Sequence, residues 1–217
     1  FKVQVDAPVT ALAFGNGSTL AITMRSPGHD DLLALGFLFT EGILPDRAAI
    51  LECAQPSRLG KSPLENVIEV HLHPDPEVDL AQLNRHFYTS SSCGVCGKTS
   101  IDNVTRQIAQ VLPVASPRLR PELFYQLPEK LRARQPAFQQ TGGQHAVALF
   151  DTTGDCLACF EDVGRHNAMD KLIGSALMQG LLPLHEHIVM VSGRARFELV
   201  QKALMAGVPA LAAVGAP

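Results

Sequence analysis

Hydrophobic and polar positions in the first third of the chain follow two different periods. Mostly apolar runs at 9–14 and 19–25 flank a Gly-Asn-Gly turn, which predicts a β-hairpin. Residues 32–39 are apolar on most sides, follow a Ser-Pro helix start and end before Gly42, so they predict a buried helix. Alternation over 66–72 predicts a further strand.

The last third of the chain has the most regular pattern. Its periodicity predicts a strand at 145–150, a strand at 156–160 and a helix at 165–178. A strand at 187–191, a helix at 195–205 and a strand at 208–214 follow. The last three elements form a strand–helix–strand unit, which implies a parallel strand pair joined by a crossover helix. The predicted fold class is therefore α/β, with an antiparallel hairpin at one side of the sheet.

The middle of the chain is less regular. Short helices are predicted at 79–87 and 99–111. Residues 112–140 hold five prolines and many charges, so they predict a connector with short helical turns. We expect an N-terminal subdomain at 1–112, a connector at 113–140 and a strand–helix–strand portion at 141–217.

Composition restricts the function classes. With 46% hydrophobic residues the chain can form a sizeable core, and its net charge of -3 without a basic stripe argues against nucleic-acid binding. The apolar runs are shorter than the roughly 18 to 20 residues that cross a bilayer, and no secretory signal pattern opens the chain. We therefore predict a soluble, cytoplasmic protein that binds neither nucleic acid nor membrane.

The five cysteines are an odd number, and all but Cys53 form two Cys-x-x-Cys pairs. Reduced thiols that do chemistry or bind metal are expected in a cytoplasm. The second pair, Cys156 and Cys159, lies in a predicted strand, where alternation would place the two side chains on opposite faces. That geometry is poor for one metal ion, so this pair is interpreted as two small buried apolar residues.

The first pair, Cys93 and Cys96, lies in a loop rich in serine and glycine, directly before Lys98. A thiolate is the reactive form of cysteine, and its pKa falls beside a cation or a helix N-terminus, both of which are predicted here. Three interpretations stay open: a mobile sulfur carrier, a dithiol–disulfide oxidoreductase, and a zinc site shared with Cys156 and Cys159. The zinc site would join pairs about 60 residues apart, whereas zinc ribbons use about 15 to 20. The oxidoreductase would need a thioredoxin-like context, which this pattern does not show.

Polar residues follow two predicted strands where each turns into a helix. The two sets are Arg165, His166 and Asn167, and Ser192, Gly193 and Arg194. Side chains at strand ends in α/β sheets commonly face a ligand crevice, and free helix amides with an arginine suit a phosphate. The alternative for the first set is a helix cap with Asp162 as the N-cap residue. Together the two sets predict one anion-binding crevice.

Four longer motifs stand in a fixed order along the chain. They are SSCGVCGK, TGGQH, EDVGRHN and VSGR at 91–98, 141–145, 161–167 and 191–194. In this order they resemble the FdhD/NarQ family, the formate dehydrogenase accessory sulfurtransferases. The resemblance spans residues 5–217.

The resemblance implies a specific activity. Such proteins take sulfur from a cysteine desulfurase and pass it to bis-molybdopterin guanine dinucleotide, before this molybdenum cofactor enters formate dehydrogenase. Cys93 matches the family's persulfide cysteine and Cys96 its loop partner, and no metal ligand is assigned. The hypothesis places the cofactor on the strand-end residues Arg165, His166, Asn167, Ser192, Gly193 and Arg194. The alternative is a chaperone that binds the molybdenum cofactor without transferring sulfur.

The resemblance also implies a fold, a cytidine deaminase-like α/β sandwich with a small N-terminal β-rich portion, commonly as a homodimer. The chain lacks a His-x-Glu motif partnered with Pro-Cys-x-x-Cys, so deaminase chemistry is not expected. The family continues for some tens of residues beyond the Gly-Ala-Pro at 215–217, and that tail carries part of the cofactor site. We therefore expect a C-terminal tail to be missing here.

Overall fold

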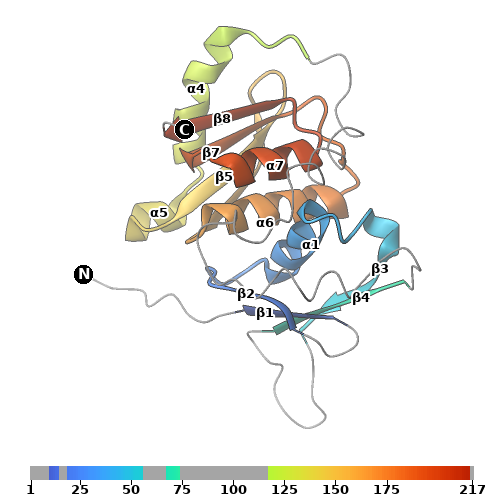
Figure 1. Ribbon diagram of the computed structural model, residues 1–217. Helices are drawn as coiled ribbons and strands as arrows, with labels where there is room; N and C mark the ends of the chain where they lie inside the picture. The colour runs from blue at the N-terminus through green and yellow to red at the C-terminus, as the bar shows by residue number, and fades with distance from the viewer. Residues whose placement is uncertain (1–9, 15–18, 56–66, 74–116, 216–217) are drawn as a thin grey trace.

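The structure is a computed structural model, and it describes residues 10–14, 19–55, 67–73 and 117–215. Its elements form two four-stranded sheets, with helices packed between the sheets and against the outer face of one of them (Figure 1). The mixed α/β class is confirmed. Among the described residues, no helix is both long enough and apolar enough to cross a bilayer.

The N-terminal sheet has the strand order β2-β1-β4-β3. Its strands are β1 (Thr10–Phe14), β2 (Thr19–Thr23), β3 (Ile50–Ala54) and β4 (Val67–Leu72). β1 pairs antiparallel with β2 and parallel with β4, which confirms the predicted hairpin and the predicted third strand. The sequence did not predict β3 or the short 3-10 helix η1 (Arg47–Ala49) before it. A register shift between Ile50 and Glu52 breaks the alternation of β3.

Helix α1 (Asp30–Thr40) lies between the N-terminal sheet and helix α6 (Arg165–Met178), and both helices confirm the prediction (Figure 1). Asp30 and Asp31 in the first turn of α1 interact favourably with the positive end of the helix dipole. α1, β4 and the last turn of α6 share one buried core, made by Ala34, Leu35, Leu38, Ile43, Leu44, Ile68, Val70 and Leu177.

Helices α1 and α6 cross at two glycines, which lets their backbones touch. A Cβ atom at Gly36 would lie 1.8 Å from the carbonyl oxygen of Asp170, and one at Gly174 would lie 2.0 Å from that of Leu32. No side chain fits at either position unless the helices move apart. The crossing therefore fixes the position of α6, whose N-terminus carries predicted site residues.

The C-terminal sheet has the strand order β6-β5-β7-β8. Its strands are β5 (His145–Phe150), β6 (Cys156–Asp162), β7 (Ile188–Arg194) and β8 (Ala210–Gly215). β5 and β6 form the predicted antiparallel hairpin, and β7 and β8 are the predicted parallel pair, joined by helix α7 (Phe197–Met205). Residues 192–194, expected in a turn, belong to β7, because pairing with β8 continues to Arg194 and Gly215.

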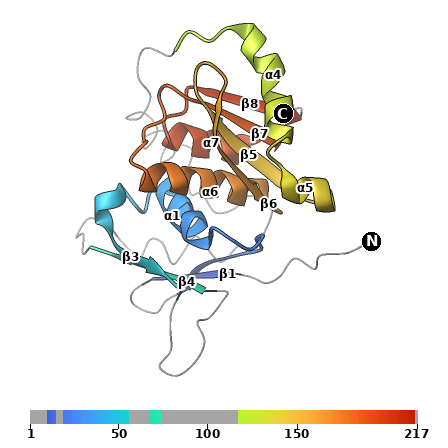
Figure 2. The ribbon, with the colours of Figure 1, turned by 180° about the vertical axis from the view of Figure 1, so that it is seen from behind.

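Helices cover both faces of the C-terminal sheet (Figure 2). α6 and α7 pack on one face, and helix α4 (Pro121–Arg132) packs on the other, followed by helix α5 (Pro136–Thr141). The expectation of only short helical turns at 112–140 is therefore wrong for α4, which buries a leucine every fourth residue at Leu123, Leu127 and Leu131. The prolines misled the prediction, because those that begin α4 and α5 are compatible with the first position of a helix.

The predicted placement of Cys156 and Cys159 on opposite faces of β6 is also wrong. Ala158 pairs with Leu149 and Cys156 pairs with Phe150, so Leu157 is an extra residue in β6. This bulge turns both cysteines to the face covered by α4, where they are half-buried against the same core. The interpretation of both cysteines as small apolar residues fits this packing. The regular alternation on which it was based is interrupted at Leu157.

Candidate functional site

The candidate site lies at one edge of the C-terminal sheet. There the start of β5 meets the ends of β6 and β7, and helices α6 and α7 begin. His145 is the register partner of Asp162 across β5 and β6. A Cβ atom at Gly193 would lie 3.2 Å from His145 Nδ1 and 3.9 Å from Arg165 Cδ. The two predicted residue sets therefore meet, as expected, at what we call the site edge.

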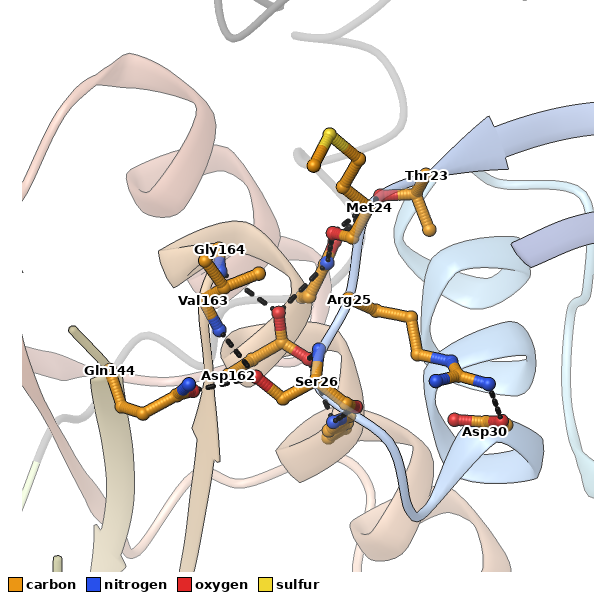
Figure 3. Close-up of polar contacts among 11 residues, drawn as sticks. Thr23, Met24, Arg25, Ser26, Asp30, Gln144, Asp162, Val163 and Gly164 are labelled. Atoms are coloured by element: carbon orange, nitrogen blue, oxygen red, sulfur yellow. Dashed lines mark hydrogen bonds and ion pairs between the residues drawn. The ribbon is translucent and has the colours of Figure 1, made fainter. Parts of the chain in front are cut away.

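Asp162 holds the end of β6 against the rest of the molecule. It is 0% exposed, and its Oδ2 atom lies 2.7 Å from the Lys171 ammonium and accepts the Ser26 N–H at 3.1 Å. Its Oδ1 atom accepts hydrogen bonds from the Gly164 N–H and from Asn167 Nδ2 (Figure 3). Gly164, not Asp162, is the N-cap residue of α6. Asp162 is therefore a buried ion-pair and hydrogen-bond centre rather than the helix cap that was the alternative prediction.

The segment between β2 and α1, residues 24–29, docks on the first turn of α6 (Figure 3). The Ser26 hydroxyl donates to Gln144 Oε1 at 2.7 Å and accepts the Val163 N–H at 3.0 Å. The Ser26 carbonyl accepts from the Lys171 ammonium at 2.9 Å. These bonds connect residues more than 100 positions apart in sequence and fix the N-terminal half beside the site edge.

Asn167 belongs to the same network. Its Nδ2 atom donates to the Met24 carbonyl at 2.7 Å and to Asp162 at 3.0 Å, and its Oδ1 atom accepts from the Thr23 hydroxyl at 3.2 Å. The side-chain amide is buried, and its nitrogen and oxygen both have protein partners. Asn167 thus links β2 and the segment after it to the start of α6. Its predicted contact with a cofactor stays a prediction.

Arg165 and His166 begin α6, and each has a buried polar atom that lacks a hydrogen-bond partner among the described residues. Arg165 Nε is buried and has no hydrogen-bond partner among the described residues. Burial, followed by the nearby Lys202 and Arg165 cations, lowers the pKa of His166 to about 4. Burial likewise lowers the pKa of His145, with a smaller effect of Arg165 in the same direction. Both imidazoles are therefore neutral near pH 7 beside a permanently charged guanidinium.

The end of β7 supplies the second predicted set. The Ser192 hydroxyl oxygen accepts the Ala146 N–H at 2.8 Å, which leaves its own hydrogen available to a ligand. Gly193 lacks a side chain where His145 and Arg165 pack closely. Arg194 is exposed at the strand end. An arginine pair, a hydroxyl and neutral imidazoles together can bind an anion that also presents hydrogen-bonding groups.

A second polar layer lies one helical turn further inside. Lys202 of α7 donates to Asp170 of α6 at 2.8 and 3.0 Å and to the Thr40 hydroxyl of α1 at 2.8 Å. Its ammonium also lies 3.6 Å from the Glu41 carboxylate and 5.5 Å from the Phe37 ring centroid. This buried cluster joins three helices below the site edge.

Cys93 and Cys96 lie outside the described residues, so the carrier, redox and zinc interpretations of their loop stay predictions. The cysteines that are described have unreactive thiols. Burial raises the pKa of Cys53 to about 12 and that of Cys159 to about 12, and it also raises the pKa of Cys156. A protonated thiol is a poor nucleophile, so none of these three suits sulfur transfer.

Sequence reasoning missed two residues at the site edge. His145 was placed only in a strand and in the TGGQH motif, and Glu198, four residues after the VSGR motif, was given no role. Glu198 lies on the first turn of α7, with its Oε2 atom 4.0 Å from His166 Nε2. Neither position is evident from local spacing, because the packing of α7 on α6 brings Glu198 to His166, and the pairing of the strands brings His145 to Gly193.

The sequence profile of the FdhD/NarQ family matches residues 6–217. The chain belongs to this family. It is 50% identical over 206 residues to the sulfur carrier protein FdhD of Streptomyces avermitilis, covering 93% of this chain and 73% of that protein. It is 44% identical over 209 residues to the sulfur carrier protein FdhD of Mycobacterium tuberculosis, covering 93% of this chain and 75% of that protein.

A solved structure has the same fold as this FdhD/NarQ chain. It is the crystal structure of a proposed formate dehydrogenase accessory protein from Desulfotalea psychrophila, with a TM-score of 0.68 and 20% sequence identity. The match covers 97% of this chain and 74% of that one. The similarity extends to both sheets, because it includes nearly the whole chain.

Proposed function

We propose that this chain is a sulfur carrier in formate dehydrogenase maturation. It accepts sulfur from a cysteine desulfurase as a persulfide on Cys93 and delivers it to bis-molybdopterin guanine dinucleotide. The main support is that relatives sharing 44% to 50% of its residues are named sulfur carrier protein FdhD. The Cys-Gly-Val-Cys loop and the high thiol pKa values of the three described cysteines direct the chemistry to Cys93 and Cys96.

Loading is a thiol exchange. The Cys93 thiolate attacks the outer sulfur of the desulfurase's cysteine persulfide, the donor's sulfur–sulfur bond breaks, and the donor cysteine leaves as a thiolate. Cys93 then bears the persulfide. A thiolate is required at this step, and Lys98 supplies a nearby positive charge in the sequence.

Release uses the second thiol of the loop. The Cys96 thiolate attacks the inner sulfur of the Cys93 persulfide, the outer sulfur leaves as hydrosulfide for the cofactor, and a Cys93–Cys96 disulfide forms. A small-molecule or protein thiol then reduces this disulfide. Two cysteines at this spacing thus reduce the outer sulfur to sulfide without another reductant in that step.

The site edge suits the cofactor's phosphates. Arg165 and Arg194 provide positive charge, Ser192 provides a hydroxyl donor, and Gly193 leaves room for His145. His166 offers a neutral ring, since burial lowers its pKa to about 4. Asn167 positions this set through its bonds to Met24 and Asp162.

The finer features of the proposal concern architecture and setting. Helices on both faces of the C-terminal sheet support the cytidine deaminase-like sandwich. We place the carrier in the cytoplasm as a homodimer, between the desulfurase and formate dehydrogenase.

Mass spectrometry after incubation with a cysteine desulfurase and cysteine tests the proposal. The Cys93 peptide should gain about 32 Da per sulfur, and Cys93→Ala should abolish both this gain and formate dehydrogenase maturation. Cys53→Ala is the matched control, because its buried thiol has a pKa near 12 and should take no part. Cofactor binding without any gain on Cys93 would instead support the chaperone function.

A further inference from the structure

Glu198 and His166 face each other between the first turns of α7 and α6. Their side chains are 12% and 27% exposed, and Glu198 Oε2 lies 4.0 Å from His166 Nε2. Both atoms are buried, and neither has a hydrogen-bond partner in the described part of the chain. Arg165 Nε, on the neighbouring residue, is also buried and has no partner among the residues that the structure describes. Unsatisfied polar atoms of this kind are rare in folded proteins and call for an explanation.

A structural role alone does not explain the Glu198 carboxylate. A carboxylate in the first turn of a helix interacts favourably with the helix dipole, but that interaction requires no burial. Lys202, one turn later on α7, could in principle pair with Glu198. Its ammonium already lies 2.8 Å from Asp170 and 3.6 Å from Glu41. Glu198 therefore brings a negative charge to the site edge, where its Oε2 atom has no hydrogen-bond partner among the described residues.

The 4.0 Å between Glu198 Oε2 and His166 Nε2 is too long for a hydrogen bond, so both atoms are left to a partner outside the described residues. An atom about 2.8 to 3.0 Å from both Glu198 Oε2 and His166 Nε2 would form two normal hydrogen bonds. A carboxylate only accepts hydrogen bonds, and one nitrogen of a neutral imidazole also accepts. A ligand group with two N–H hydrogens satisfies both atoms when His166 Nε2 is the accepting nitrogen, whereas a bare phosphate oxygen offers no hydrogen to the Glu198 carboxylate and is repelled by it.

We propose that Glu198 determines ligand specificity at the site edge. It accepts a hydrogen bond from an amino group that the ligand carries beside its anionic group, and it disfavours small anions that have no such donor. The inference rests on the proposed function, because it takes the site edge as the place where an anionic cofactor binds. Arg165 attracts the anion, and Glu198 selects for the amino group.

Binding of inorganic pyrophosphate tests the repulsive half of this proposal. Glu198→Gln keeps the size of the side chain and removes its charge, so pyrophosphate should bind about tenfold more tightly than to the wild type. Glu122→Gln is the matched control, since Glu122 is exposed on α4, on the opposite face of the sheet. Isothermal titration calorimetry measures both. Unchanged or weaker pyrophosphate binding by the Glu198 variant would overturn the proposal, as would an equal gain in the control.

A matched pair of ligands tests the selective half. Aminomethylphosphonate and ethylphosphonate have similar shapes and differ in an ammonium group against a methyl group. The wild type should prefer the amino compound, and Glu198→Gln should lower that preference about tenfold. The same preference in both proteins would refute the assignment.

Two measurements keep these outcomes interpretable. Circular dichroism melting establishes that Glu198→Gln folds, and Glu198→Ala repeats the pyrophosphate experiment with a second side chain. Persulfide formation on Cys93 is measured separately on the wild type. A protein that gains sulfur on Cys93 and yet shows no role of Glu198 would refute this inference and leave the sulfur-carrier proposal in place.

Discussion

At the scale of single residues, buried polar side chains decide how the site edge is held. Asp162 and Lys171 are almost fully buried and form an ion pair at 2.7 Å. Burying two charges is favourable only when their remaining hydrogen bonds are made. Ser26, Gly164 and Asn167 provide those bonds. The residues of the site edge are thus held in place by a buried polar network.

His166 should make stability depend on acid pH. Burial lowers its pKa from 6.5 to about 4, so between these values the unfolded chain binds a proton that the folded protein does not. Its contribution to stability is complete above about pH 6.5 and decreases as the pH falls toward 4. His166→Gln removes this linkage, and the wild type should lose on the order of 2 kcal/mol more than the variant between pH 7 and pH 4.5. Urea unfolding at both pH values measures the difference, and parallel pH dependences would contradict the expectation.

At the scale of the elements, the crossing of α1 and α6 brings two helix backbones into direct contact. The glycines at the crossing are needed for their small size, because the opposing carbonyl oxygens occupy the space of a Cβ atom. α6 also carries Arg165, His166 and Asn167 at its N-terminus. One helix therefore connects the crossing to the site edge.

Gly36→Ala should destabilise the protein by about 3 kcal/mol or more, because the added methyl group meets the Asp170 carbonyl oxygen and forces the helices apart. Thermal or urea unfolding measures the loss. Gly143→Ala is the control, since a Cβ atom there has nothing within 4 Å and the change should stay within about 0.5 kcal/mol. Equal stabilities of the two variants would show that the helices can separate without loss.

At the scale of the whole molecule, polar contacts join the N-terminal half to the C-terminal half. The segment at residues 24–29 docks on α6, and Lys202 links α7 to Asp170 of α6 and Thr40 of α1. The apolar core around α1 also includes Leu177 of α6. The two sheets are consequently parts of one packed body, with helices between them (Figure 1).

The Lys202–Asp170 pair gives a prediction at this scale. Lys202→Met should lower stability by about 3 to 5 kcal/mol, because it leaves the Asp170 carboxylate buried without its counter-charge. The double variant Lys202→Met with Asp170→Leu removes both charges and should recover much of this loss. Urea unfolding of the single and double variants provides the comparison. A double variant less stable than Lys202→Met would show that the pair is not the source of the effect.

The sequence by itself determined the local elements and the motifs. Periods of 3.6 and 2 residues are local properties of a chain, so they located α1, α6, β4 and the strands of the C-terminal sheet. The order of the SSCGVCGK, TGGQH, EDVGRHN and VSGR motifs was sufficient to indicate the family, which the family profile over residues 6–217 confirms.

Tertiary structure alone decided which side chains meet. The bulge at Leu157 and the register of β3 depend on partner strands. Helix α4 is stabilised because its leucines pack on the outer face of the C-terminal sheet. The Asp162–Lys171 ion pair and the opposition of Glu198 and His166 depend on the packing of helices that are distant in sequence. Local spacing cannot encode such contacts, because each is selected by the free energy of burying two surfaces together.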